Sequence, residues 1–287
     1  LELQGYGRPQ YANVQYPWDG YQDVAIGEIP TAYNPVACYI KTFFVPAQMV
    51  GKRVFISFQG AESCIAVWLN GHYVGFSSDS FTPSEFELTD YLVEGENKLA
   101  CRVERWSAGS WLEDQDFMRM SGLFRDVYLY AIPKAHIADL HLKTLLDDSY
   151  TDAALDLSVQ MALDPSVGAC SVSFELTDGG RLVASAACKA EASLHVQLPV
   201  KAPKLWSSES PYLYDLLLTV RDADGRVLEA VPQRVGFRRF EMKDGMMHLN
   251  GKRIVFKGVN RHDFCTDSGR VVPVETLRRD LLTMKRN

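Results

Sequence analysis

No run of apolar residues in this 287-residue sequence approaches the roughly 20 residues that a membrane-spanning helix needs, and no secretory signal peptide opens it. Excess positive charge is also absent, because 30 Lys and Arg residues stand against 36 Asp and Glu residues, for a net charge of −6. Nucleic acids and anionic membranes are recognised largely through basic clusters. We therefore expect neither a nucleic-acid partner nor a membrane partner.

Paired cysteines of the C-x-x-C type are missing as well. The six cysteines are scattered singly, most of them in apolar, strand-like segments: Cys38, Cys64, Cys101, Cys170, Cys188 and Cys265. Single cysteines in apolar segments are typical of buried, reduced thiols, which persist in the cytoplasm. The sequence thus predicts a cytoplasmic protein, although an even number of cysteines leaves disulfides open.

The first part of the chain is rich in Val, Ile, Phe and Tyr, in short runs that turn residues separate. The runs cover residues 38–45, 53–58, 65–76, 97–106 and 124–130. Asn70-Gly71 in the third run predicts a tight hairpin, because a type I′ turn needs positive φ at both central residues. Many short antiparallel strands with tight turns predict a jelly-roll sandwich over residues 1–133.

A second β-rich segment follows over residues 134–240, with Asp178-Gly179 and Asp224-Gly225 as turns. We predict strands at residues 136–146, 154–163, 170–177, 182–187, 194–198, 213–221, 227–230 and 234–240. Strands of this length and spacing indicate an immunoglobulin-like sandwich. The segment contains no candidate catalytic residue.

Residues 241–287 have a different pattern. Residues 247–264 predict a hairpin and then an apolar strand that ends in a polar cluster, and a helix follows from Val272 to Asn287. Leu277, Leu281 and Met284 give this helix one apolar stripe. A strand, a polar loop and a helix make one βα unit. Such a unit needs neighbouring strands, so we expect further βα units beyond Asn287.

The segment between residues 105 and 127 lacks strand alternation and carries three carboxylates within four residues, Glu113, Asp114 and Asp116. Carboxylates this close repel one another unless a cation or hydrogen-bond donors lie among them. A packed acidic loop with aromatic neighbours suits a hard cation or sugar hydroxyls. The alternative is a surface loop whose acids pair with the arginines Arg105, Arg119 and Arg125.

Three motifs in this sequence resemble those of the β-galactosidases of glycoside hydrolase family 2. They are Leu-Glu-Asp-Gln-Asp followed by Arg-Met-Ser-Gly-Leu-Phe-Arg-Asp-Val (residues 112–116 and 119–127), Gly-Tyr-Gly-Arg-Pro-Gln-Tyr-Ala-Asn-Val-Gln-Tyr-Pro (residues 5–17), and Lys-Gly-Val-Asn-Arg-His (residues 257–262). The resemblance implies a mainly β chain. A jelly-roll sugar-binding sandwich is followed by an immunoglobulin-like sandwich and by the first βα unit of an incomplete TIM barrel.

The same resemblance implies roles for individual residues. Asn13 reaches into the active site and hydrogen-bonds the galactose, for which an amide is suited because it both donates and accepts. Asp116 contacts the galactosyl group and a sodium ion whose other ligands come from the barrel, and His262 touches the substrate. Arg261 supports barrel carboxylates, whereas Glu113 and Asp114 are structural. The Asp-Phe-Cys-Thr after His262 departs from the family pattern, which leaves open the roles from Asp263 onward.

Retaining glycosidases need two carboxyl groups about 5 Å apart. Nothing in this chain resembles the two glutamates that serve this purpose in the family, where they come from later barrel strands. We expect the parent protein to be an Na⁺- and Mg²⁺-dependent homo-oligomer that hydrolyses terminal β-D-galactosides with retention, and this chain alone to be inactive. The alternatives are another family 2 specificity, β-glucuronidase or β-mannosidase, and a free-standing carbohydrate-binding protein.

Overall fold

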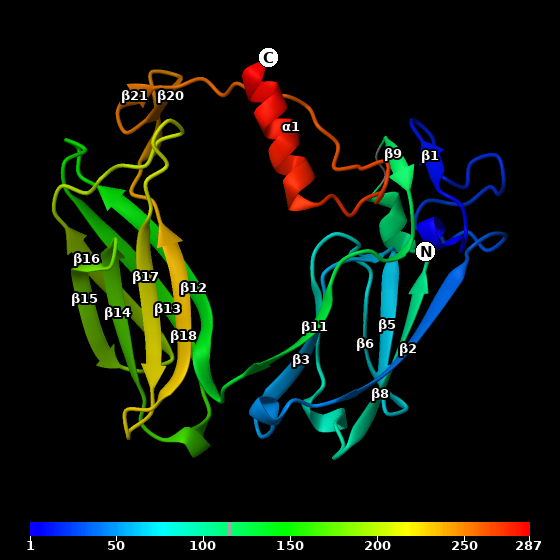
Figure 1. The fold of residues 1–287 in the computed structure, drawn as a ribbon, viewed down its shortest axis with the longest axis horizontal. Coiled ribbons are helices and arrows are strands. Elements are labelled where there is room, and N and C mark those ends of the chain that lie inside the picture. Colours follow the sequence, from blue (N-terminus) through cyan, green and yellow to red (C-terminus); the bar gives the residue numbers. More distant parts are fainter. Residues whose placement is uncertain (114–115) are drawn as a thin grey trace. The chain divides into compact units, whose positions relative to one another are not determined.

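The computed structural model describes residues 1–113 and 116–287. The chain divides into two compact units, the first made of Leu1–Ala131 with Val259–Asn287 and the second of Ile132–Gly258 (Figure 1). Strands dominate both units, so the prediction of a mainly β chain is confirmed. Short 3₁₀ helices interrupt the strands at η1 (Glu2–Gln4), η2 (Ala47–Met49), η3 (Thr89–Tyr91), η4 (Ala108–Trp111) and η5 (Pro165–Val167).

The first unit is a sandwich of antiparallel strands. One sheet has the order β2 (Val36–Phe44), β8 (Glu96–Glu104), β5 (Cys64–Leu69), β6 (His72–Ser77), and the other has the order β11 (Val127–Ile132), β3 (Arg53–Phe58), β7 (Ser84–Glu87). Side chains of both sheets, among them Phe58, Ile65 and Leu69, form one buried core. Burying each such side chain stabilises the fold by about 1.5–3 kcal/mol. Because alternate side chains of a strand face the core, this burial produces the apolar alternation by which the sequence located these strands.

The predicted Asn70-Gly71 hairpin is confirmed between β5 and β6. Asn70 has φ 52° and Gly71 has φ 85°, as a type I′ turn requires. The Asn70 side-chain amide donates to the Tyr91 carbonyl at 2.9 Å and to Asn97 Oδ1 at 2.8 Å. The turn is therefore fixed by its side chain as well as by its backbone.

Two small antiparallel ladders complete the strands of the first unit. They pair β4 (Ala61–Glu62) with β10 (Gly122–Leu123), and β1 (Gln10–Ala12) with β9 (Phe117–Arg119). The second ladder joins the N-terminal arm (residues 5–17) to the acidic loop (the segment between residues 105 and 127). It positions the residues considered below.

The second unit is an immunoglobulin-like sandwich. One sheet has the order β12 (Ala135–Leu146), β13 (Ala153–Leu163), β16 (Ser193–Val200), and the other β15 (Arg181–Lys189), β14 (Ser171–Asp178), β17 (Tyr214–Arg221), β18 (Val227–Val235). Both sheets contribute to one core, with Leu157, Phe174 and Leu216 almost fully buried.

The prediction of two separate strands at 227–230 and 234–240 is wrong, because β18 runs unbroken from Val227 to Val235 through Pro232. β18 is the edge strand of its sheet. A proline is tolerated there because its missing N–H can face away from the ladder.

The apolar strand predicted after the hairpin, within residues 247–264, is also absent. The chain forms the small sheet β19 (Phe240–Lys243), β20 (Met246–Leu249), β21 (Lys252–Arg253), and residues 254–264 then have no regular structure. An apolar strand of a parallel barrel forms only beside neighbouring strands, and the described residues supply none for it. The predicted helix is confirmed as α1 (Val274–Arg286), although no residue of it is buried.

Two further observations concern the whole described chain. None of its helices is both long enough and apolar enough to cross a membrane. All six cysteines are free, with Cys64, Cys101 and Cys170 buried and Cys38 exposed.

Candidate functional site

The acidic loop is anchored to the sandwich by Glu113. Its carboxylate accepts hydrogen bonds from the Ser80 backbone N–H at 2.8 Å and from the Ser80 hydroxyl at 2.6 Å, and Ser80 is fully buried. Asp114 lies outside the described residues. The Glu113 carboxylate thus accepts from two neutral donors, which stabilise its charge. Arg119, the third arginine considered as a partner of the acids, donates to the Glu113 backbone carbonyl at 3.2 Å.

Two of the arginines considered as partners of the acidic loop bind elsewhere. Arg105 is buried, donates from both terminal nitrogens to the Arg8 carbonyl at 3.1 Å, and lies 3.7 Å from the Glu2 carboxylate. Arg125 donates to the backbone carbonyls of Phe81 at 2.7 Å and Gln59 at 3.2 Å. These contacts join residues far apart in the chain, so the local sequence could not indicate them.

The pairing of β1 with β9 brings Asn13 close to Asp116. In this ladder Tyr11 lies opposite Met118 and Ala12 opposite Phe117. Asn13 comes directly after Ala12, and Asp116 comes directly before Phe117, so both lie one residue beyond this pair at the same end of the ladder. Both are exposed. The arm and the acidic loop therefore present these two side chains from neighbouring positions.

Tyr11 fixes the Asp116 carboxylate. Its hydroxyl donates to Asp116 Oδ1 at 2.5 Å. This hydrogen bond to the carboxylate is the main reason why the pKa of Tyr11 is raised, since losing the phenolic proton would place two negative charges together. A carboxylate has further lone pairs, so Asp116 can accept from a sugar hydroxyl or bind a cation while it keeps Tyr11.

Asp116 and His262 line one open cavity of about 660 Å³ in the first unit. The other residues lining it are Tyr11, Phe81, Met118, Arg125, Asp263, Phe264 and Arg270. Asn13 lies outside this lining, at the adjacent end of β1. Two of the three predicted site residues therefore share a cavity, and the third is next to one of them in the ladder.

The cavity combines hydrogen-bonding groups with aromatic side chains, as a polyhydroxylated ligand requires. Its second carboxylate, Asp263, forms an ion pair with Arg261, which also bonds Asp280 at 2.6 Å. The pairing with Asp280 raises the pKa of Arg261. Among the described residues no group of three or more Asp, Glu, His or Cys side chains could hold a metal ion.

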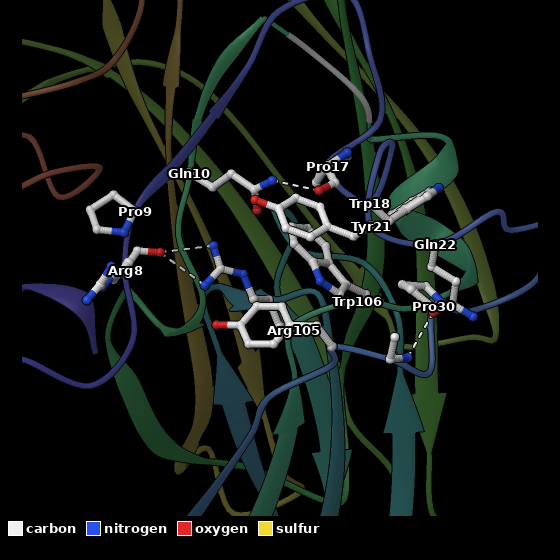
Figure 2. Close-up of a pocket in the computed structure, with 12 residues that line it drawn as sticks. Arg8, Pro9, Gln10, Pro17, Trp18, Tyr21, Gln22, Pro30, Arg105 and Trp106 are labelled. Carbon is white, nitrogen blue, oxygen red and sulfur yellow. Dashed lines mark hydrogen bonds between the residues drawn. The ribbon is translucent and has the colours of Figure 1, made fainter.

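A second cavity, of about 390 Å³, lies beside the arm that carries Asn13 (Figure 2). Gln10 lines this cavity, whereas the next residue of β1, Tyr11, lines the larger one. Successive side chains of a strand point to opposite faces, so this arrangement is expected. Figure 2 shows the Gln10 amide bonded to the Pro17 carbonyl, at 2.6 Å, and the Arg105 guanidinium bonded to the Arg8 carbonyl. These bonds hold the arm on both sides of Asn13.

Sequence reasoning missed several residues that line the larger cavity: Tyr11, Phe81, Met118, Arg125, Phe264 and Arg270. Tyr11 could have been found, because in an extended arm it lies on the same face as Asn13, two residues later. Phe81 and Arg270 gave no such indication, since they come from loops without a periodic pattern.

Three domain descriptions of one family match consecutive parts of the chain. The match to "Glycosyl hydrolases family 2, sugar binding domain" covers residues 1–133, and that to "Glycosyl hydrolases family 2" covers residues 135–238. The match to "Glycosyl hydrolases family 2, TIM barrel domain" covers residues 240–287. Together these matches account for nearly the whole sequence.

Individual proteins agree with these matches. A beta-galactosidase of Halalkalibacterium halodurans is 50% identical over 289 aligned positions, covering 100% of this chain and 28% of that protein. A beta-glycosidase structure from Bacteroides vulgatus covers 95% of this chain and 34% of its own, with 27% identity and a TM-score of 0.77. A Bacteroides uniformis beta-glucuronidase structure, at 24% identity and TM-score 0.78, covers 88% and 32% and shows the fold alone. The chain spans about 28% of the first relative's length, and by these matches it belongs to glycosyl hydrolase family 2.

Proposed function

We propose that the protein to which this chain belongs is a β-galactosidase that cleaves terminal β-D-galactosides with retention, and that this chain supplies part of its substrate site. The observation that carries the proposal is the shared cavity of Asp116, from the sandwich, and His262, from the segment matched to the barrel domain. The 50% identity to a protein named beta-galactosidase supports the specificity.

Each of the three residues has a proposed task. The Asn13 amide hydrogen-bonds a galactose hydroxyl, both donating and accepting. Asp116, oriented by Tyr11, accepts from a second hydroxyl, and the imidazole of His262, which lines the same cavity, contacts the sugar as well. Tyr11 is a positioning residue in this scheme, because it acts on the sugar through Asp116.

We also propose that Asp116 binds a sodium ion. A hard carboxylate is a fitting ligand for a hard cation, and the lone pairs not used by Tyr11 can serve it. The described residues do not offer a complete ligand set, so the remaining ligands would come from the rest of the protein. The Mg²⁺ expected from the resemblance finds no fitting cluster among the described residues, and we assign no residue to it.

The chemical step requires two carboxyl groups about 5 Å apart, one as nucleophile and one as acid/base. Of the two carboxylates lining the cavity, Asp263 is already paired with Arg261 and Asp116 with Tyr11. We therefore propose that this chain alone is inactive and that the catalytic pair lies elsewhere in the parent protein. A cytoplasmic homo-oligomer remains our expectation for that protein.

The substrate preference of the full-length protein tests the proposed specificity. The full-length protein should release nitrophenol from a β-D-galactoside far faster than from a β-D-glucuronide or β-D-mannoside, and this chain alone should release none. A preference for the glucuronide would refute the galactosidase proposal.

Asn13→Ala should raise KM and lower kcat/KM up to about tenfold, because one hydrogen bond contributes about 0.5–1.5 kcal/mol. Gln233→Ala, which removes an exposed amide in β18 of the second unit, should change neither constant. Equal effects of the two substitutions would contradict the role assigned to Asn13.

A further inference from the structure

Arg270 anchors the irregular segment after Val259 in the first sandwich. Its guanidinium pairs with the Glu62 carboxylate through Nη1 and donates through Nη2 to the Met118 carbonyl at 2.8 Å. The side chains of Arg270 and Glu62 are only 8% and 6% exposed. The guanidinium carbon also lies 5.5 Å and 5.9 Å from the ring centroids of Phe81 and Phe124. Cation–π contact with two rings adds to the two polar contacts.

The two polar partners of Arg270 belong to different parts of the site. Glu62 is in β4, which pairs with β10 just after the acidic loop. Met118 is in β9, opposite Tyr11 and two residues after Asp116. One guanidinium therefore joins the sandwich to β9, the strand that begins directly after Asp116.

Between His262 and Arg270 the chain makes a closed turn. Cys265 N–H donates to the Gly269 carbonyl at 2.7 Å, and Gly269 N–H donates back to Cys265 at 2.8 Å. Phe264 N–H donates to the His262 carbonyl at 3.0 Å. The position of Arg270 is thus transmitted to His262 through a short, hydrogen-bonded segment rather than through a free loop.

A buried ion pair of this kind is poorly explained by stability alone. Burial raises the pKa of Glu62 to about 7 even though Arg270 and Arg119 lower it, which shows how costly this environment is for the charge. Desolvation of such a pair can offset its attraction, so the pair is weak evidence for stability, and in some proteins buried ion pairs instead define one geometry. A planar guanidinium with two fixed acceptors and two flanking rings defines one position.

We propose that Arg270 is a positioning residue, which places His262 in the cavity that Asp116 also lines by attaching its segment at two points, to Glu62 of β4 and to Met118 of β9. The proposal rests on the proposed function for its consequence in catalysis, but the attachment itself is a property of this chain. Arg261, which the sequence singled out, instead pairs within its own segment with Asp263 and Asp280.

The attachment is tested on this chain by amide hydrogen exchange. In Arg270→Ala, exchange over residues 259–272 should rise at least tenfold while the strands of the first unit keep their protection. Arg102→Ala, which removes an exposed pair with Glu104, is the control and should leave exchange at 259–272 unchanged. Unchanged exchange in Arg270→Ala, or an equal rise throughout the unit, would overturn the proposal.

The consequence is tested in the full-length protein with a chromogenic β-galactoside. Arg270→Ala should lower kcat/KM by roughly tenfold to a hundredfold, because misplacing a binding group by about 1 Å has effects of this size. Arg270→Lys should restore only part of the loss, since one ammonium cannot meet both acceptors in the same plane. Full restoration by lysine would overturn the two-point attachment, and so would an unchanged kcat/KM in a variant whose segment has detached.

These outcomes separate this proposal from the proposed function. If the wild-type protein hydrolyses no β-galactoside while Arg270→Ala still releases residues 259–272 from protection, the proposed function fails and the attachment stands. If the wild-type protein is active and the exchange is unaffected, the attachment fails and the function stands.

Discussion

Replacing Glu113 by alanine should destabilise the first unit selectively. The Ser80 N–H and hydroxyl donate to this carboxylate at 2.8 Å and 2.6 Å, and Ser80 is fully buried. In Glu113→Ala both donors lose their acceptor, and within the described residues the hydroxyl keeps only a long hydrogen bond to the Ser63 carbonyl, at 3.5 Å. Each buried unsatisfied group costs about 1–3 kcal/mol, so we expect a loss of about 2–4 kcal/mol.

The measurement is thermal unfolding followed by tryptophan fluorescence and by far-UV circular dichroism. Four of the five tryptophans lie in the first unit and one, Trp206, in the second, so fluorescence reports mainly the first unit. Two units need not unfold as one, and the transition of the second serves as an internal control. At roughly 2–4 °C per kcal/mol for a unit of this size, the first transition should fall by several degrees.

Glu113→Gln is the matched variant, because it keeps a carbonyl oxygen in nearly the same place. It should lose less than half as much stability as Glu113→Ala. The reasoning is refuted if Glu113→Ala costs under about 1 kcal/mol, which is the lower bound for a single orphaned donor. It is equally refuted if the transition of the second unit moves with the first.

Two other expectations follow from the ionisable groups. Asp116→Asn should lower the pKa of Tyr11 toward that of an ordinary tyrosine, because the hydrogen bond to the carboxylate is the main cause of its rise, and NMR titration of the labelled phenol carbon measures this. Burial raises the pKa of Cys101 to about 12, so its thiol should resist alkylation under conditions that label the exposed Cys38, as mass spectrometry would show. An unfolded cysteine thiol has a pKa of ~8.5. The stability linked to Cys101 is therefore complete below that pH and is lost as the pH rises toward 12.

The fold was predictable wherever a strand buries one face. Residues 53–58 and 136–146 have the alternation that burial requires, and their predicted limits agree with β3 and β12 to within one residue. The errors arose where neighbours decide the outcome. Pro232 lies between the two strands predicted at 227–230 and 234–240, but on an edge strand it does not interrupt β18. The apolar residues after the hairpin have the composition of a strand, but among the described residues they have no partner strand.

The site was predictable in part, for a different reason. Asn13, Asp116 and His262 were identified through motifs, and the structure brings Asp116 and His262 to one cavity. Their supports, Tyr11 and Arg270, follow from pairings between residues distant in sequence. Such contacts leave no local periodicity. The spacing could place Tyr11 on the same face of the arm as Asn13, but it could indicate neither the hydrogen bond from Tyr11 to Asp116 nor the contacts of Arg270.

The most direct test of the central claim is the sodium dependence of β-galactoside hydrolysis by the full-length protein, wild type against Asp116→Asn. Sodium would be replaced by choline at constant ionic strength, with Gln233→Ala as the control. We predict that kcat/KM of the wild type and the control falls as sodium is removed, whereas Asp116→Asn starts from a low kcat/KM that barely responds to sodium. A sodium response of wild-type size in Asp116→Asn would contradict the account, because Asp116 would then not be the cation's ligand in this site.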